Sequence, residues 1–126
     1  MLWSIVFLIA FGTVIPKLPA NTGCFILFLN LMHYVYIIFS ESVQKFYIGE
    51  TEDITERLVK HNSGAYKNAF TSQACDWEIQ TVIACENRTI ALKIEKHIKS
   101  MKSKVYVNNL TKHEELRERL ISRFSN

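Results

Sequence analysis

The chain has 126 residues, of which 48% are hydrophobic and 21% charged, with four Gly, two Pro and three Cys. This length supports one compact domain, and the composition excludes disordered, collagen-like and disulfide-rich proteins. The formal net charge of +3 is too small to indicate a nucleic-acid partner by itself. Because Cys24, Cys75 and Cys85 form no C-x-x-C pair, they predict neither a zinc site nor a disulfide framework.

Residues 1–31 form an apolar leader whose composition differs from that of the rest of the chain. Its one charged residue is Lys17, whereas all twelve acidic residues follow Met32. Three interpretations are open: a mis-assigned start with translation beginning at Met32, a signal peptide, or a membrane anchor. The first is favoured because a strand pattern follows Met32 without a polar spacer. Neither apolar run of the leader reaches the roughly 20 residues of a membrane span. We therefore expect a cytoplasmic protein without a membrane partner.

The segment after the leader predicts an antiparallel hairpin. Residues 33–39 are rich in Tyr, Val and Ile, which favour strands, and both faces of this strand are apolar enough to be buried. After a polar turn, residues 45–49 form a second short strand. On that strand Tyr47 and Gly49 share one face, and Phe46 and Ile48 share the other.

A helix, a long loop and a third strand follow. Asp53 and Glu56 form a capping box that begins a helix over residues 54–62. Residues 63–76 are predicted to be a loop, of a length that more often indicates function than simple connection. Residues 77–85 alternate as a strand. The alternation places four side chains on one side of that strand: Trp77, Ile79, Thr81 and Ile83.

Two helices complete the predicted fold. Asn87 caps a helix that runs to about residue 101. A second capping box, Thr111 to Glu114, begins a C-terminal amphipathic helix over residues 111–126. The order β-β-α-β-α-α predicts an α+β fold in which helices flank a small three-stranded antiparallel sheet. The apolar stripe of the first helix is Ile90, Ile94, Ile98 and Met101, and that of the second, which would cover the core or dock a partner, is Leu116, Leu120 and Phe124.

The helix over residues 88–102 has an uneven charge, since its one acidic residue, Glu95, stands among several basic ones. Helical spacing places Glu95 at the edge of the apolar stripe, with Lys99 and Lys102 on its flank. A lone carboxylate among cations suits a divalent metal ion together with a phosphodiester. The alternative is a solvated helix face on which Glu95 pairs with Lys99, and the charge pattern alone favours it.

Two further pairs of residues have chemical potential. Arg57 and His61 lie four residues apart on one helix, where they can hold a phosphate oxygen and relay a proton, although such pairs are usually simple surface residues. Tyr36 and Tyr47 lie on adjacent strands. A phenol is a poor base unless cations or a metal-bound water lower its pKa, and most strand tyrosines are packing residues.

The order of these residues resembles the GIY-YIG endonuclease family. The similarity is to the small stand-alone form, which is also similar to the nuclease module of the excinuclease of nucleotide-excision repair. The resemblance covers about residues 32–110. Tyr34-Val35-Tyr36 stands at the first triplet, and Tyr47-Ile48-Gly49 is the second triplet. Further matches at similar spacings are Thr51, Arg57, His61-Asn62, Phe70-Thr71, Trp77-Glu78 and residues 91–99, whereas Asp76 stands where Pro commonly precedes the Trp.

The resemblance implies hydrolysis of DNA phosphodiesters with one divalent ion, Mg²⁺ or Mn²⁺, and no small-molecule cofactor. Glu95 matches the metal-binding carboxylate, Tyr47 the proposed general base, and Tyr36 the tyrosine that orders the site. Arg57 matches the arginine that stabilises the transition state, and His61 matches a residue that assists the base or the phosphate. DNA contacts would come from Thr51, Tyr66, Lys67, Lys99 and Lys102, with stacking by Tyr66 and Phe70.

Because phosphate contacts carry no sequence information, we expect selection by DNA structure, in DNA repair or processing and with a larger repair complex as partner. One alternative is a catalytically weak or inactive nucleic-acid-binding module of the same fold. Another, if residues 1–31 are genuine, is a secreted or membrane-tethered nuclease.

Overall fold

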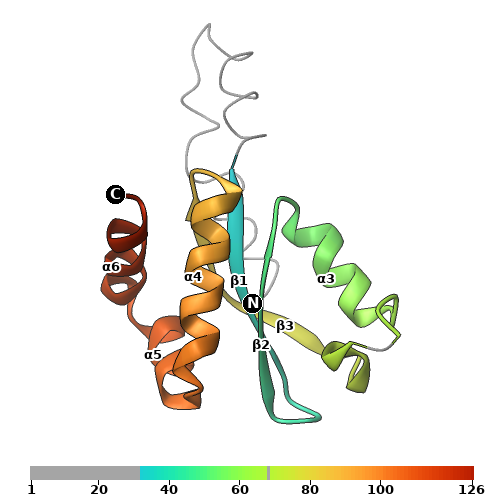
Figure 1. The fold of residues 1–126 in the computed structure, drawn as a ribbon. Helices are drawn as coiled ribbons and strands as arrows, with labels where there is room; N and C mark the ends of the chain where they lie inside the picture. Colours follow the sequence, from blue (N-terminus) through green and yellow to red (C-terminus); the bar gives the residue numbers. More distant parts are fainter. Residues whose placement is uncertain (1–31, 68) are drawn as a thin grey trace, which may run out of the picture.

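A computed structural model describes residues 32–67 and 69–126, so the predictions for residues 1–31 lie outside the described residues. Three antiparallel strands form one sheet in the order β2-β1-β3 (Figure 1). Within the described ranges, no helix is both long and apolar enough to cross a membrane. The strands are β1 (His33–Ser40), β2 (Lys45–Thr51) and β3 (Trp77–Cys85).

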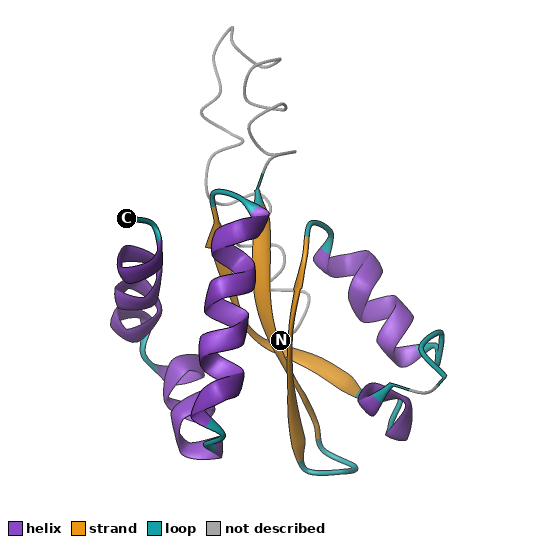
Figure 2. Cartoon of the chain, viewed as in Figure 1, coloured by secondary structure: helices purple, strands orange, loops and turns teal. Residues whose placement is uncertain are grey.

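The sheet separates two groups of helices (Figure 2). Helix α3 (Ile54–Asn62) and the short 3-10 helix η3 (Phe70–Gln73) belong to one group. The other group comprises α4 (Arg88–Met101), α5 (Lys104–Lys112) and α6 (Glu114–Phe124). The predicted α+β class with a three-stranded antiparallel sheet is confirmed.

The central strand β1 contributes alternate side chains to two cores. Val35 and Ile37 pack with α4, α5 and α6, whereas Tyr36 and Ile38 pack with Ile54 of α3. All four of these β1 side chains are almost completely buried. The prediction that both faces of this strand are buried is confirmed, because helices cover both sides of the sheet.

Strand β3 changes sides along its length. Trp77 and Ile79 lie in the core on the α3 side, but Ile83 lies in the core on the α4 side. The β1–β3 register shifts where Gln80 is an extra residue in β3, and such a bulge moves the alternation by one position. The prediction that Trp77, Ile79, Thr81 and Ile83 share one side was therefore wrong.

The C-terminal region holds two helices where the sequence predicted one. The Ser103 hydroxyl caps α5 by accepting the Tyr106 N–H, and Thr111 lies inside α5, where its hydroxyl donates to the Asn108 carbonyl. The last helix begins at Glu114 without a side-chain cap, so its predicted start at residue 111 was wrong. The sequence of α5 is rich in β-branched and Asn residues of low helix propensity, and burial of its apolar face stabilises it instead.

The predicted apolar stripes are confirmed except at one position. Ile90, Ile94 and Ile98 are buried, but Met101 is 45% exposed because α4 ends there. Leu120 of α6 is buried, and Leu116 and Phe124 pack against the same core. The α6 stripe therefore covers the core and is not a free docking face.

Asp76 connects the β1–β2 turn to the start of β3. Its carboxylate accepts hydrogen bonds from the Ser40 hydroxyl at 2.5 Å and from the Ser42 N–H at 2.9 Å. These bonds, with a further one from the Ser42 hydroxyl, lower the pKa of the Asp76 carboxyl to about 2. An acidic residue before Trp77 thus holds the hairpin in place.

Gly49 allows the side chain of Tyr36 to cross the hairpin. The two residues are directly opposite in the β1–β2 register. A Cβ atom at position 49 would overlap the Tyr36 hydroxyl and lie 2.6 Å from its Cζ atom. A side chain at this position would force the Tyr36 ring to move.

We predict that Gly49→Ala lowers the free energy of unfolding by about 1–3 kcal/mol, the usual cost of forcing a group into a packed site. Urea denaturation measures the effect. The matched control is Gly64→Ala, where no atom lies within 4 Å and the cost comes only from the left-handed backbone at φ +74°. The same variants should also differ in the near-UV tyrosine signal. A native tyrosine signal in Gly49→Ala would contradict the overlap with Tyr36.

Candidate active site

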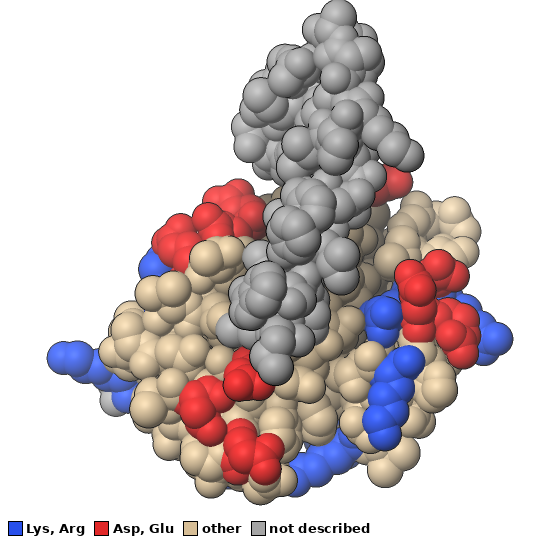
Figure 3. Space-filling view, turned by 180° about the vertical axis from the view of Figure 1, so that it is seen from behind, with Lys and Arg blue, Asp and Glu red and all other residues tan. Residues whose placement is uncertain are grey.

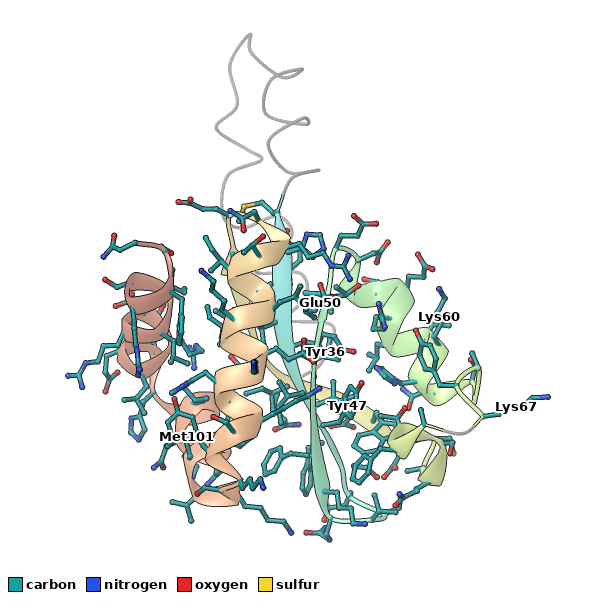
Figure 4. All side chains as sticks on the ribbon, viewed as in Figure 1. Tyr36, Tyr47, Glu50, Lys60, Lys67 and Met101 are labelled. Atoms are coloured by element: carbon teal, nitrogen blue, oxygen red, sulfur yellow. The ribbon has the colours of Figure 1, made fainter. Side chains whose placement is uncertain are left out.

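The two hairpin tyrosines lie on the same face of the sheet, between α3 and α4 (Figure 4). Tyr47 is paired with Ile38, two residues along each strand from the Tyr36–Gly49 pair. The ring centroids of Tyr36 and Tyr47 are 6.2 Å apart. Tyr36 is 2% exposed, whereas Tyr47 is only partly buried, so Tyr47 is the more accessible of the two.

His61 joins Tyr36 to η3, the short 3-10 helix before β3. The Tyr36 hydroxyl lies 2.8 Å from His61 Nε2, and the Thr71 hydroxyl lies 2.7 Å from His61 Nδ1. Burial, reinforced by the Arg57 charge, lowers the pKa of His61 to about 4, so the imidazole is neutral at pH 7. A neutral ring donates through one nitrogen and accepts through the other, so both of its nitrogens are satisfied here.

Tyr36 is held in its neutral form by the same environment. Burial raises the pKa of its phenol well above the usual value, and Tyr47, Tyr66 and Glu95 act in the same direction. Arg57 opposes this rise. The groups that influence this pKa thus come from β2, α3, the following loop and α4.

Two anchors of this arrangement were not assigned a role from the sequence. The Asn62 side chain accepts the Trp77 N–H at 2.8 Å and donates to the Trp77 carbonyl at 3.0 Å. The Trp77 indole N–H donates to the Thr71 carbonyl at 2.8 Å. Asn62 and Thr71 belong to two residue pairs that match the family in sequence, His61-Asn62 and Phe70-Thr71. Only the fold shows which residues they bind.

Arg57 and Tyr66 border the two tyrosines on the α3 side. The Arg57 guanidinium lies 5.8 Å from the centre of the Tyr66 ring, and the centroid of that ring is 5.1 Å from that of His61. Cation–π contact orients the guanidinium while leaving its N–H groups free for oxygen ligands. Arg57 thus presents a fixed positive charge beside the buried His61.

Glu95 and Lys99 border the tyrosines on the α4 side. Lys99 Nζ lies 2.6 Å from Glu95 Oε1 and 5.7 Å from the centre of the Tyr47 ring. The Glu95 side chain is 16% exposed, and the Lys99 side chain is 49% exposed. The pairing of Glu95 with Lys99 that the charge pattern favoured is present, and Lys99 also lies over the Tyr47 ring of the hairpin.

The Glu95 carboxylate is an oxygen donor that suits a hard divalent ion. Mg²⁺ retains several waters and needs few protein oxygens, so one partly exposed carboxylate such as Glu95 can hold it. In residues 32–67 and 69–126 no three His, Cys, Asp or Glu side chains are grouped to hold a metal.

The structure does not bring every predicted DNA-contacting residue to this place. Thr51 is 6% exposed, and its hydroxyl donates to the Asp53 carbonyl and accepts the Asp53 N–H, so we correct it to a structural residue of the turn before α3. Lys67 points away from the two tyrosines (Figure 4). Lys102 follows the end of α4 and lines a groove beside the cluster.

The low pKa of His61 predicts a loss of stability in mild acid. Its pKa falls from 6.5 to about 4 on folding, so the folded state binds fewer protons than the unfolded state between these values. The stabilisation is complete above pH 6.5 and is lost as the pH falls through 4, by roughly 3 kcal/mol in total. Urea unfolding between pH 7.5 and 4 should show this slope. His61→Gln should lack it, and equal slopes in both proteins would contradict the assignment.

Comparisons with known proteins agree with this geometry. A family model described as the GIY-YIG catalytic domain matches residues 32–110. Comparisons with the curated proteins and with the solved structures gave no significant match. The match spans more than half of the chain and contains both hairpin tyrosines, Arg57, His61 and Glu95. The chain therefore belongs to the GIY-YIG endonuclease family and is a phosphodiester-hydrolysing nuclease.

Proposed function

We propose that this protein is a metal-dependent endonuclease that selects DNA by its structure and acts in the cytoplasm in DNA repair or processing, with a larger repair complex as partner. The observation that carries the proposal is the convergence of residues from three elements on one place. The hairpin supplies Tyr36 and Tyr47, α3 supplies Arg57 and His61, and α4 supplies Glu95.

The residues divide the work of hydrolysis by charge and exposure. Hydrolysis of a phosphodiester adds negative charge to the phosphoryl oxygens as water attacks phosphorus and the ester oxygen leaves. Arg57 binds these oxygens, and Lys99 binds the adjoining backbone phosphate. Glu95 would hold the metal ion, which when bound polarises the phosphoryl group and acidifies the attacking water.

Tyr47 is the proposed general base because it is the more accessible hairpin phenol and has Lys99 beside its ring. Tyr36 and His61 are positioning residues in this proposal. Burial keeps the phenol protonated and the imidazole neutral, so neither carries a charge that would compete for Arg57. Their hydrogen bond fixes the hairpin against α3 and so sets the distance between Tyr47 and Arg57.

We predict that Glu95→Gln and Arg57→Gln each lower the cleavage rate on the order of 10²-fold or more, as the loss of one transition-state contact typically does. Nicked, flapped and branched DNA are incubated with and without Mg²⁺ or Mn²⁺, and products are resolved on gels. The matched controls are Glu118→Gln and Arg119→Gln on α6, which should cleave like the wild type. Binding without cleavage in every metal would support the alternative of an inactive nucleic-acid-binding module.

Removing the hydroxyl of Tyr47 or of Tyr36 should affect cleavage and stability differently. We predict that Tyr47→Phe abolishes most cleavage while leaving the free energy of unfolding unchanged, because its hydroxyl acts only in the reaction. Tyr36→Phe should also lower the free energy of unfolding, by about 1–3 kcal/mol, since His61 Nε2 loses its buried partner. Urea denaturation and single-turnover cleavage measure both variants. Equal stability losses in the two variants would contradict this division of roles.

A further inference from the structure

We propose that a lysine-rich groove beside the catalytic cluster binds unpaired nucleotides that adjoin the scissile phosphate. This inference rests on the proposed nuclease function and specifies its substrate class. The preferred DNA would carry an unpaired segment next to the cleavage site, as in a flap or an open loop.

The groove lies between β2, η3 and the α4–α5 junction and has a volume of about 360 Å³. Its surface is mainly apolar, and among the described residues no carboxylate lines it. The charged and aromatic lining residues are Lys45, Lys99, Lys102, Lys104, Phe46 and Phe70. Four ammonium groups around an apolar floor are complementary to a polyanion that also carries flat apolar rings.

Most of these lysines are not neutralised by carboxylates. Of the four, only Lys99 forms an ion pair within the described ranges. The nearest polar partner of Lys45 is the Gln73 side chain at 3.4 Å, and that of Lys104 is the Gln44 carbonyl at 3.5 Å. Positive charges gathered without acids repel one another, and phosphate groups would relieve that repulsion.

The aromatic floor is available for base stacking. Phe70 is 42% exposed although it is a large apolar side chain, and Lys45 Nζ lies 5.2 Å from its ring centre. Bases stack on such rings irrespective of their sequence. The faces of bases in a duplex are covered by the neighbouring base pairs, so only a base that has left the stack can pack on Phe70.

The groove adjoins the catalytic cluster at Phe70 and Lys99. The Phe70 ring is stacked on the Tyr47 ring, with centroids 6.4 Å apart and planes inclined by 21°. Lys99 lines the groove and also lies over the Tyr47 ring. A strand whose phosphate lies at Tyr47 and Arg57 therefore meets the groove within the next nucleotides.

The other end of β2 is less favourable for DNA. A second cavity, of about 400 Å³, is lined by Arg57 and four carboxylates, together with Lys60, Arg88 and His33. One of these carboxylates, Glu50, lies on the opposite side of Tyr36 from Tyr47 (Figure 4). Acidic side chains also occur among the basic ones on the face seen in Figure 3. Repulsion by the carboxylates of the second cavity would direct the DNA strand toward the lysine groove. The four carboxylates are Glu50, Glu52, Asp53 and Glu56.

The test compares the full chain with Lys45→Ala/Lys104→Ala, two groove lysines that lie outside the catalytic cluster. Fluorescein-labelled ten-nucleotide oligothymidine and a hairpin duplex are titrated in EDTA at several salt concentrations, and anisotropy is measured. We expect oligothymidine binding to weaken about tenfold and its salt slope to fall by about 1.4, because two phosphate contacts are lost. Duplex binding should change less than about twofold, since a duplex does not enter the groove.

The matched control is Lys93→Ala/Lys112→Ala, which removes the same charge from exposed positions that line neither cavity. It should bind both probes like the wild type. Phe70→Leu keeps an apolar side chain and should weaken oligothymidine binding roughly fivefold through lost stacking. Unchanged oligothymidine binding, or equal weakening by the groove and control pairs, would overturn the inference.

Cleavage separates this inference from the proposed function. With Mg²⁺, the ratio of flap cleavage to duplex cleavage should fall in Lys45→Ala/Lys104→Ala. If the wild type cuts DNA and this ratio is unchanged, the groove inference alone is overturned. If the wild type cuts no DNA with either metal yet binds oligothymidine through the groove lysines, metal-dependent cleavage is contradicted and the groove inference is supported.

Discussion

The buried hydrogen-bond chain from Tyr36 through His61 to Thr71 is the interaction on which the site depends. It joins the central strand to α3 and to η3, and each of its three side chains is at most 2% exposed. A buried polar group without a partner costs about 1–3 kcal/mol, so the three elements are stable only in a register that satisfies both imidazole nitrogens. These hydrogen bonds thereby fix the hairpin against α3 without an ion pair.

Gly49 makes this hydrogen-bond chain possible, and hydrogen bonds of Asn62 and Trp77 hold it in place. Tyr36 reaches His61 by passing over Gly49, a path that any side chain at position 49 would block. Asn62 pairs with the Trp77 backbone, and the Trp77 indole holds the Thr71 carbonyl. Two neighbouring residues of α3 therefore have different roles: His61 binds Tyr36 in the site, and Asn62 binds the backbone of β3.

Electrostatics distinguish the groups that position the site from those proposed to act in it. Burial keeps Tyr36 and His61 uncharged, whereas the charged residues around them are partly buried, as Arg57 and Glu95 are, or exposed, as Lys99 is. Charged groups at the rim of a buried neutral cluster can exchange partners easily. Lys99 pairs with Glu95, and under the proposed function a phosphate would replace this carboxylate as its partner if Glu95 held the divalent ion.

The sequence by itself determined the local elements and supplied the candidate site residues. Strand patterns, the Asp53 and Asn87 caps and the two tyrosine triplets depend on neighbouring residues, so they could be predicted from the chain alone. The shift of β3 between two cores, the helix at 104–112 and the partners of Thr51 and Thr71 could not. They depend on contacts between residues far apart in sequence: the bulge at Gln80, the burial of Val107 and Leu110, and the return of the loop to α3. Only the tertiary structure decided that Lys45 and Lys104, about sixty residues apart in the chain, share one groove, because their closeness in space follows from how α4 packs along β2.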